Sequence, residues 1–82
     1  MPHVTVLYFA SVRDCVRRES EIIDLPAHTT DRAVLDAVAG RHPAAADLLA
    51  TCRLAVDQAF ASGAIELSAT SEVAVIPPVS GG

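Results

Sequence analysis

Residues 72–76 read Glu-Val-Ala-Val-Ile, and Pro77-Pro78 follow directly. In an extended chain alternate side chains point to opposite faces, so the two valines share one face, and the alanine and isoleucine share the other. A segment that is apolar on both faces is typical of a strand in the interior of a sheet. This stretch therefore predicts a central β-strand that ends where the prolines begin.

A second strongly apolar run, residues 4–9, reads Val-Thr-Val-Leu-Tyr-Phe. Its β-branched and aromatic residues predict another strand, and we place it beside residues 72–76 in the centre of the sheet. Residues 21–25 predict a strand with Ile23 and Leu25 on one face. We expect this strand to pair with residues 4–9 as an antiparallel hairpin, with a short helical turn between the two.

The main helix is predicted to begin around Thr29-Thr30-Asp31, since a threonine can cap the first free N–H groups and an aspartate suits the positive end of the helix. Apolar residues then recur at helical spacing, namely Val34, Leu35 and Val38. Gly40 is expected to end the helix. Pro43 is expected to start a short second helix, because proline has no N–H to leave unpaired.

The remaining chain contains weaker strand patterns. Residues 53–57 predict a strand with Leu54 and Val56 facing inward, and residues 59–67 predict an irregular stretch with one short strand. Two strands, a helix and two or three further strands are most simply packed as one helix on one face of a mixed sheet. The fold is thus predicted to be α+β, a ubiquitin-like β-grasp whose mixed sheet has four to five strands, with one main helix plus short helices.

Composition limits the classes of function. The 82 residues carry a net charge of −4, and 51% are apolar, which fits one small domain with an aliphatic core. All six basic residues are arginines. The net charge argues against a nucleic-acid partner, which requires a basic face. No segment resembles a signal peptide or a membrane-spanning helix, so we expect a cytoplasmic protein without a membrane partner.

The sequence contains no recognisable active site of its own. His3, His28 and His42 are far apart and are each expected in loops or on the surface, so no metal site is predicted. Glu19 and Glu21 alternate in a way that is typical of a solvent-facing strand. No glycine-rich phosphate loop is present either, and we expect no bound cofactor.

The end of the chain has an unusual composition. Residues 1–76 are predicted to form the domain and residues 77–82 an extended tail of Pro77, Pro78, Val79, Ser80, Gly81 and Gly82. The prolines stiffen the base of this tail, and the glycines let its tip enter a channel too narrow for a Cβ atom. A carboxylate is inert until it is converted to an acyl adenylate. Gly82 would therefore need a partner that uses ATP.

The sequence resembles the small subunit of molybdopterin synthase, a MoaD-type sulfur carrier, over essentially its whole length. The resemblance rests on Val6–Ala10 with Val12–Asp14, on Leu25-Pro26, on the helix after Thr30, on Leu54–Asp57, and above all on Glu72–Gly82.

This resemblance implies a function for the tail and a set of partners. An E1-like adenylating enzyme would activate Gly82 with ATP, and a sulfur-donating sulfurtransferase would supply the sulfur of a C-terminal thiocarboxylate. The tail would then enter the large synthase subunit of a heterotetramer and donate sulfur to cyclic pyranopterin monophosphate. The large subunit would supply the catalytic side chains, so the chain would be a sulfur donor and not an enzyme alone.

The resemblance also implies an apolar partner-facing patch made by Phe9, Phe60 and Ile76, with Arg13 beside it. From the residue pattern alone, Phe9 and Ile76 could simply be core residues, and Arg13 could equally be a solvated side chain. The family usually has Asn in place of Asp57 and a glycine in the turn at residues 70–72. The local loop is therefore expected to differ here.

Alternatives remain open at this point. A sulfur carrier for thiazole or thiolated-nucleoside synthesis would share the Gly-Gly end, although thiazole carriers typically lack the Pro-Pro-Val-Ser segment. A ubiquitin-like protein modifier would share it too, but a chain without lysine cannot build isopeptide chains on itself. A plain interaction module with an inert tail is the fourth alternative.

Overall fold

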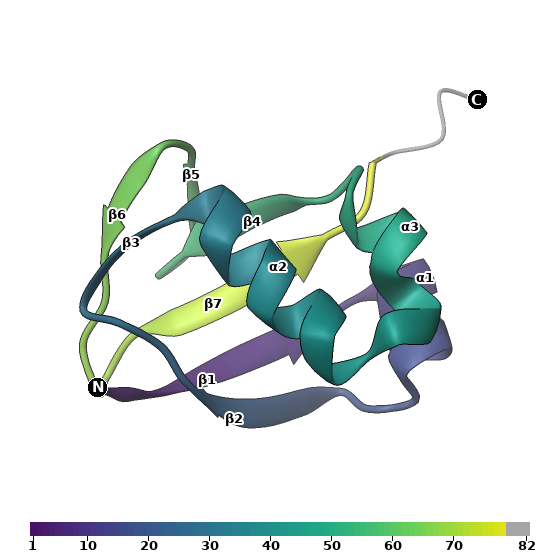
Figure 1. Ribbon diagram of the computed structural model, residues 1–82, viewed down its shortest axis with the longest axis horizontal. Coiled ribbons are helices and arrows are strands. Elements are labelled where there is room, and N and C mark those ends of the chain that lie inside the picture. Colours follow the sequence, from purple (N-terminus) through teal and green to yellow (C-terminus); the bar gives the residue numbers. More distant parts are fainter. Residues whose placement is uncertain (79–82) are drawn as a thin grey trace.

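Five strands form the main sheet in the order β2-β1-β7-β4-β5 (Figure 1). The structure is a computed structural model that describes residues 1–78. The strands of this sheet are β1 (His3–Tyr8), β2 (Ser20–Asp24), β4 (Arg53–Val56), β5 (Ala59–Ala61) and β7 (Glu72–Ile76). The predicted mixed sheet is confirmed.

Strand β7 lies at the centre of the sheet. It pairs in parallel with β1, where Leu7 lies opposite Ala74, and antiparallel with β4, where Ala55 lies opposite the same Ala74. Val73 and Val75, which point to the face of the sheet opposite Ala74, are fully buried. The predicted central position of residues 72–76 is therefore confirmed, as is the antiparallel pairing of β1 with β2.

Helix α2 (Asp31–Arg41) covers one face of the sheet (Figure 1). The Thr30 hydroxyl oxygen accepts the Ala33 N–H at 3.1 Å, as the capping pattern predicted. The prediction that Gly40 ends the helix is wrong, because the helix continues through it to Arg41. The helix ends at Arg41 with His42 as its C-cap, and Pro43 follows. The His42 side chain is held by a contact described below.

Three short helical segments complete the helical layer. They are α1 (Ala10–Val16), the 3-10 turn η1 (Pro43–Ala45) and α3 (Ala46–Leu49). The proline at the start of η1 confirms the predicted restart at this position. None of the helices within residues 1–78 is long and apolar enough to cross a membrane.

A second, two-stranded sheet was not predicted. It pairs β3 (His28–Thr30) antiparallel with β6 (Ala64–Glu66), so residues 59–67 contain two short strands where one was expected. Gly63 makes the turn before β6 with a φ of 72°, which favours glycine. Its N–H donates to Asp31 Oδ1 at 3.1 Å, which ties this turn to the start of α2.

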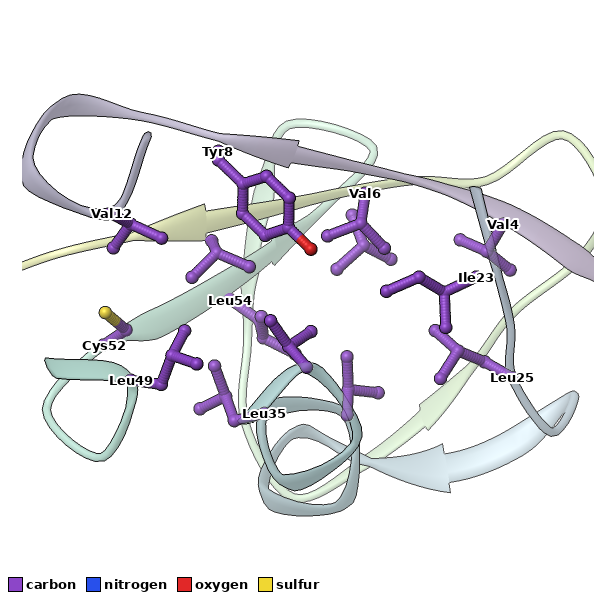
Figure 2. Packing of buried hydrophobic residues seen from close by; sticks show 14 of the residues in the cluster. Val4, Val6, Tyr8, Val12, Ile23, Leu25, Leu35, Leu49, Cys52 and Leu54 are labelled. Atoms are coloured by element: carbon purple, nitrogen blue, oxygen red, sulfur yellow. The ribbon is translucent and has the colours of Figure 1, made fainter. Parts of the chain in front are cut away.

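The core lies between α2 and the sheet, as Figure 2 shows around Tyr8, Leu35 and Leu54. It is almost entirely aliphatic, and Tyr8 is its one aromatic member among the described residues. Leu54 is fully buried as predicted, whereas Val56 is only half-buried, near the end of β4.

Side-chain hydrogen bonds stabilise the two turns that were expected to differ from the family pattern, namely the turn before β7 and the β4–β5 turn. The turn before β7 has no residue with positive φ between residues 68 and 72, and Ser71 Oγ accepts the Ser68 N–H at 2.9 Å, so no glycine is required there. Positive φ falls on Asp57 and Gln58 instead. Asp57 Oδ1 accepts the Glu72 N–H at 2.9 Å, so this carboxylate fixes the β4–β5 turn to β7.

Candidate functional site: the base of the tail and the open face of the sheet

Strand β7 ends at Ile76, directly before the tail that is predicted for residues 77–82. Pro77 is half-buried and Pro78 is exposed. Val79, Ser80, Gly81 and Gly82 lie outside the described residues, so an extended Gly-Gly tail remains a prediction.

An apolar patch lies on the face of the sheet that α2 does not cover. We call Phe9, Phe60 and Ile76 the docking patch. Phe60 is 60% exposed and Phe9 is 45% exposed, while Ile76 is half-buried. None of the three belongs to the buried core. The alternative that Phe9 and Ile76 are core residues is therefore wrong.

Arg53 lies between Phe60 and Ile76 and contacts both sides of the patch. Arg53 lies opposite Ile76 in the β4–β7 pair, and its guanidinium lies 4.2 Å from the centre of the Phe60 ring. The neighbouring positions on this face are small residues, since Ala55 lies opposite both Phe60 and Ala74. Arg53, which the sequence pattern did not single out, thus belongs to the surface around the patch.

Phe9 joins the patch at the end of β1. Tyr8 and Val75 are the last pair of the parallel β1–β7 register. Phe9 and Ile76 are the residues that follow them on the two strands. The Phe9 carbonyl accepts the N–H groups of Val12 and Arg13, at 3.1 and 3.3 Å, and thereby starts α1. Arg13 is exposed one helical turn beyond Phe9 and forms no ion pair with any residue in the range 1–78.

A buried polar cluster joins β1, β2 and the end of α2, and two predictions were wrong there. Glu21 is buried and does not face solvent, and His42 is not isolated. Tyr8 donates its hydroxyl to Glu21 Oε1 at 2.5 Å, and His42 Nε2 lies 2.6 Å from the same oxygen. Arg18 and Arg41 face Glu21 Oε2 at 3.4 and 3.7 Å. We call Tyr8, Glu21 and His42 the Glu21 cluster.

The sequence did contain a signal for the buried glutamate. Ile23 and Leu25 were predicted to face inward, and Glu21 has the same parity along the strand. The charge of the side chain favours a solvent-facing position, whereas the alternation places it in the interior.

The cluster changes the acid–base properties of two of its members. Burial raises the pKa of Tyr8 well above its ordinary value of 10.0, and the hydrogen bond to Glu21 raises it further. Burial also acts to raise the pKa of Glu21, but the hydrogen bonds from Tyr8 and His42, together with nearby positive charge such as that of Arg41, lower that pKa below 4.5. Glu21 is therefore ionised at neutral pH, and His42 Nε2 must carry a proton to donate to it.

The described residues offer little other chemistry. Within residues 1–78 no three His, Cys, Asp or Glu side chains lie close enough together to hold a metal ion. Cys15 is exposed and Cys52 is buried, and neither forms a disulfide. Burial raises the pKa of the Cys52 thiol, which makes it less reactive.

Comparison with known proteins gives matches along the whole chain. The ThiS family matches residues 6–82. The molybdopterin synthase sulfur carrier subunit of Mycosarcoma maydis is 41% identical over an alignment that covers 99% of this chain and 95% of that protein. The protein of the same name from Caenorhabditis briggsae is 34% identical and is covered completely, as is this chain.

Solved structures have the same fold at lower identity. Small archaeal modifier protein 1 of Haloferax volcanii matches with a TM-score of 0.78 and 24% identity, over 96% of this chain and 98% of that one. A chain in the Helicobacter pylori complex of subunits 1 and 2 of molybdopterin-converting factor matches with a TM-score of 0.67 and 21% identity, over 96% and 97%. The chain therefore belongs to the ThiS family and has the ubiquitin-like β-grasp fold of the MoaD-type sulfur carriers.

Proposed function

We propose that this chain is the sulfur carrier subunit of a molybdopterin synthase. The observation that carries the proposal is the full-length match to molybdopterin synthase sulfur carrier subunits, including the segment that ends in Gly81-Gly82. The open sheet face beside the base of the tail supports the proposal, because a carrier that delivers its C-terminus needs a surface on which the acceptor can dock.

The chemistry takes place at the Gly82 carboxylate. One carboxylate oxygen attacks the α-phosphorus of ATP on an E1-like adenylating enzyme, pyrophosphate leaves, and an acyl adenylate forms. The outer sulfur of a persulfide on the sulfurtransferase then displaces AMP, and a thiol reduces the resulting acyl disulfide and releases the thiocarboxylate. The thiocarboxylate sulfur displaces an oxygen from a carbon of cyclic pyranopterin monophosphate in the large subunit, and water then hydrolyses the acyl–sulfur bond and restores the Gly82 carboxylate. Two such transfers build the dithiolene of molybdopterin. In this scheme ATP is used by the partner, and no cofactor is bound here.

The tail and the docking patch have separate tasks in this scheme. Six extended residues, Pro77 to Gly82, span at most about 20 Å, which is enough to reach into a partner's active site from the sheet surface. Phe9, Phe60 and Ile76 are partly exposed and apolar, so covering them with a partner removes apolar surface from water. Arg13 and Arg53 at the margin offer charged contacts to an acidic surface of the large subunit, and the expected assembly is the heterotetramer.

Two alternatives share much of this support. The ThiS family match alone fits a sulfur carrier for thiazole or thiolated-nucleoside synthesis, and the β-grasp fold alone fits a protein modifier. The names of the full-length relatives favour molybdopterin synthesis over both. A chain without lysine also has no side-chain amine for self-conjugation.

Reconstitution with a synthase large subunit, cyclic pyranopterin monophosphate, the adenylating enzyme and a sulfur source is the decisive experiment. Molybdopterin should form with the full-length chain and should not form when Gly82 is deleted, while the circular dichroism spectrum stays the same. The mass of the isolated chain should rise by the replacement of one oxygen by sulfur. Product formation by the deletion variant would refute the proposal. Sulfur loading without any molybdopterin would favour another pathway.

A further inference from the structure

The Glu21 cluster links three separate parts of the chain. Glu21 belongs to the edge strand β2, Tyr8 is the last residue of β1, and His42 stands between α2 and η1. The Tyr8 and His42 rings also meet edge to face, with their centroids 6.0 Å apart. The remaining charged groups that face Glu21 are Arg18, from the turn before β2, and Arg41, from the last turn of α2.

Helix α1 depends on both sides of this cluster. On one side, Tyr8 is followed by Phe9, whose carbonyl starts the helix. On the other side, the His42 carbonyl accepts the Ala45 N–H at 2.9 Å and so shapes η1, which packs against α1. Cys15 of α1 lies against this segment, with its sulfur 3.7 Å from the Ala44 carbonyl oxygen.

The backbone at Ala10, the first residue of α1, is strained. Ala10 has a φ of 51°, in the left-handed region that residues with a Cβ atom disfavour. A strained residue of this kind persists only where its surroundings hold it in place. One such neighbour is Tyr8, whose ring is buried and whose hydroxyl is bound to Glu21. Phe9 is thereby left exposed on the open face.

We propose that the Glu21 cluster is a positioning device for partner docking, which holds Phe9 and α1 in the orientation that the large subunit binds. This inference rests on the proposed function. Tyr8 and Glu21 are buried and the His42 side chain is only 19% exposed, so the cluster offers a partner little surface of its own. They act through Phe9, through the Arg13 side chain and through the strained peptide at Ala10.

Removing one hydroxyl group tests the proposal with little change in packing. Tyr8→Phe keeps the buried ring and deletes the hydrogen bond to Glu21. The amides of Val12 and Arg13 bond to the Phe9 carbonyl, so their hydrogen exchange reports on the start of α1. We expect exchange at these amides to become at least about tenfold faster, as follows from losing a hydrogen bond to a charged group. The Kd for the large subunit should rise about threefold to tenfold, because the binding-competent orientation becomes less populated.

A matched control is available on the same pair of strands. Asp24 of β2 contacts His3 of β1, but this pair is exposed and lies at the far end of the strands from α1. Asp24→Asn should leave both the exchange and the Kd unchanged. At the cluster itself, His42→Gln retains an N–H donor near the position of Nε2 and should preserve binding, whereas His42→Leu should weaken it as Tyr8→Phe does.

The outcomes separate this proposal from its alternatives. Faster exchange in Tyr8→Phe with binding unchanged would overturn it, since the cluster would then only stabilise the fold. Weaker binding with unchanged exchange would also overturn it, because the effect would not pass through α1. Phe9→Asp is the separate test of the docking patch: if this variant binds as tightly as the parent, the docking surface in the proposed function is wrong. The exchange result still decides whether the cluster orients α1.

Discussion

Replacing Phe60 by Asp separates docking from folding, because this side chain is mostly exposed in the free protein. With 60% of its surface exposed, less than half of the residue is covered. Fully burying a Phe contributes about 1.5–3 kcal/mol, so the covered part contributes about 0.6–1.2 kcal/mol. Stacking of the exposed Arg53 adds about 0.5–1 kcal/mol. The free energy of unfolding should therefore fall by only about 1–2 kcal/mol.

The expected loss of binding is larger. Truncating an aromatic side chain near the centre of an interface typically weakens the binding free energy by at least about 2 kcal/mol. Asp in its place also puts an unpaired charge in the interface. The Kd for the large subunit should rise at least about 30-fold. Isothermal titration calorimetry measures the Kd, and urea unfolding of the same samples measures the free energy of unfolding.

Ile22 provides the matched control. It is 64% exposed, close to the value for Phe60, but it lies on β2, at the opposite edge of the sheet. Ile22→Asp should change the Kd by less than about twofold. The reasoning would be refuted if Phe60→Asp lost no more binding than folding free energy, or if Ile22→Asp weakened binding as much as Phe60→Asp.

Three further predictions concern stability, each measured by urea unfolding. Arg17 ends α1 with a φ of 65°, so Arg17→Gly should raise the free energy of unfolding by about 0.5–1 kcal/mol; a decrease would contradict this. Leu54 is fully buried, so Leu54→Ala should lower it by about 2–5 kcal/mol, and a loss below about 1 kcal/mol would mean that the core closes over the cavity. The third prediction concerns pH. The pKa of Glu21 is lowered on folding, so its contribution is present above pH 4.5 and is lost as the pH falls through the folded pKa. The pKa of Tyr8 is raised on folding, so its contribution is present below pH 10.0 and is lost at higher pH. Glu21→Gln should flatten the acid side of this profile, and an unchanged acid side would contradict the assignment.

The central strands could be predicted from the sequence because their side chains alternate and both faces are apolar. Residues 72–76 and 4–9 show this pattern strongly, and the structure places them side by side. The helix start was predictable from Thr30, since capping depends on one local hydrogen bond. The end of the same helix was not, because His42 contacts Glu21, which lies 21 positions earlier in the sequence, and no local pattern contains that contact.

The short β3 and β6 strands were missed for a similar reason. Three-residue segments carry too little periodicity to predict a strand, and here they exist because the two segments pair with each other and the turn at Gly63 is tied to Asp31. For the candidate site, the residue pattern gave the location of the apolar side chains but could not separate surface from core for Phe9 and Ile76. Arg53 became part of the site only through the strand register that brings it to Phe60 and Ile76.

The central position of β7 also matters while the protein is being made. This strand follows all the others in the chain, yet both β1 and β4 need it as a neighbour, so a ribosome must deliver it before the main sheet can close. The docking patch combines Phe9, which follows β1, with Phe60 of β5 and Ile76 of β7. These side chains form one surface only after the sheet has closed. In the proposed function, a nascent or truncated chain without β7 therefore lacks the complete docking patch and should not compete with the full-length chain for the large subunit.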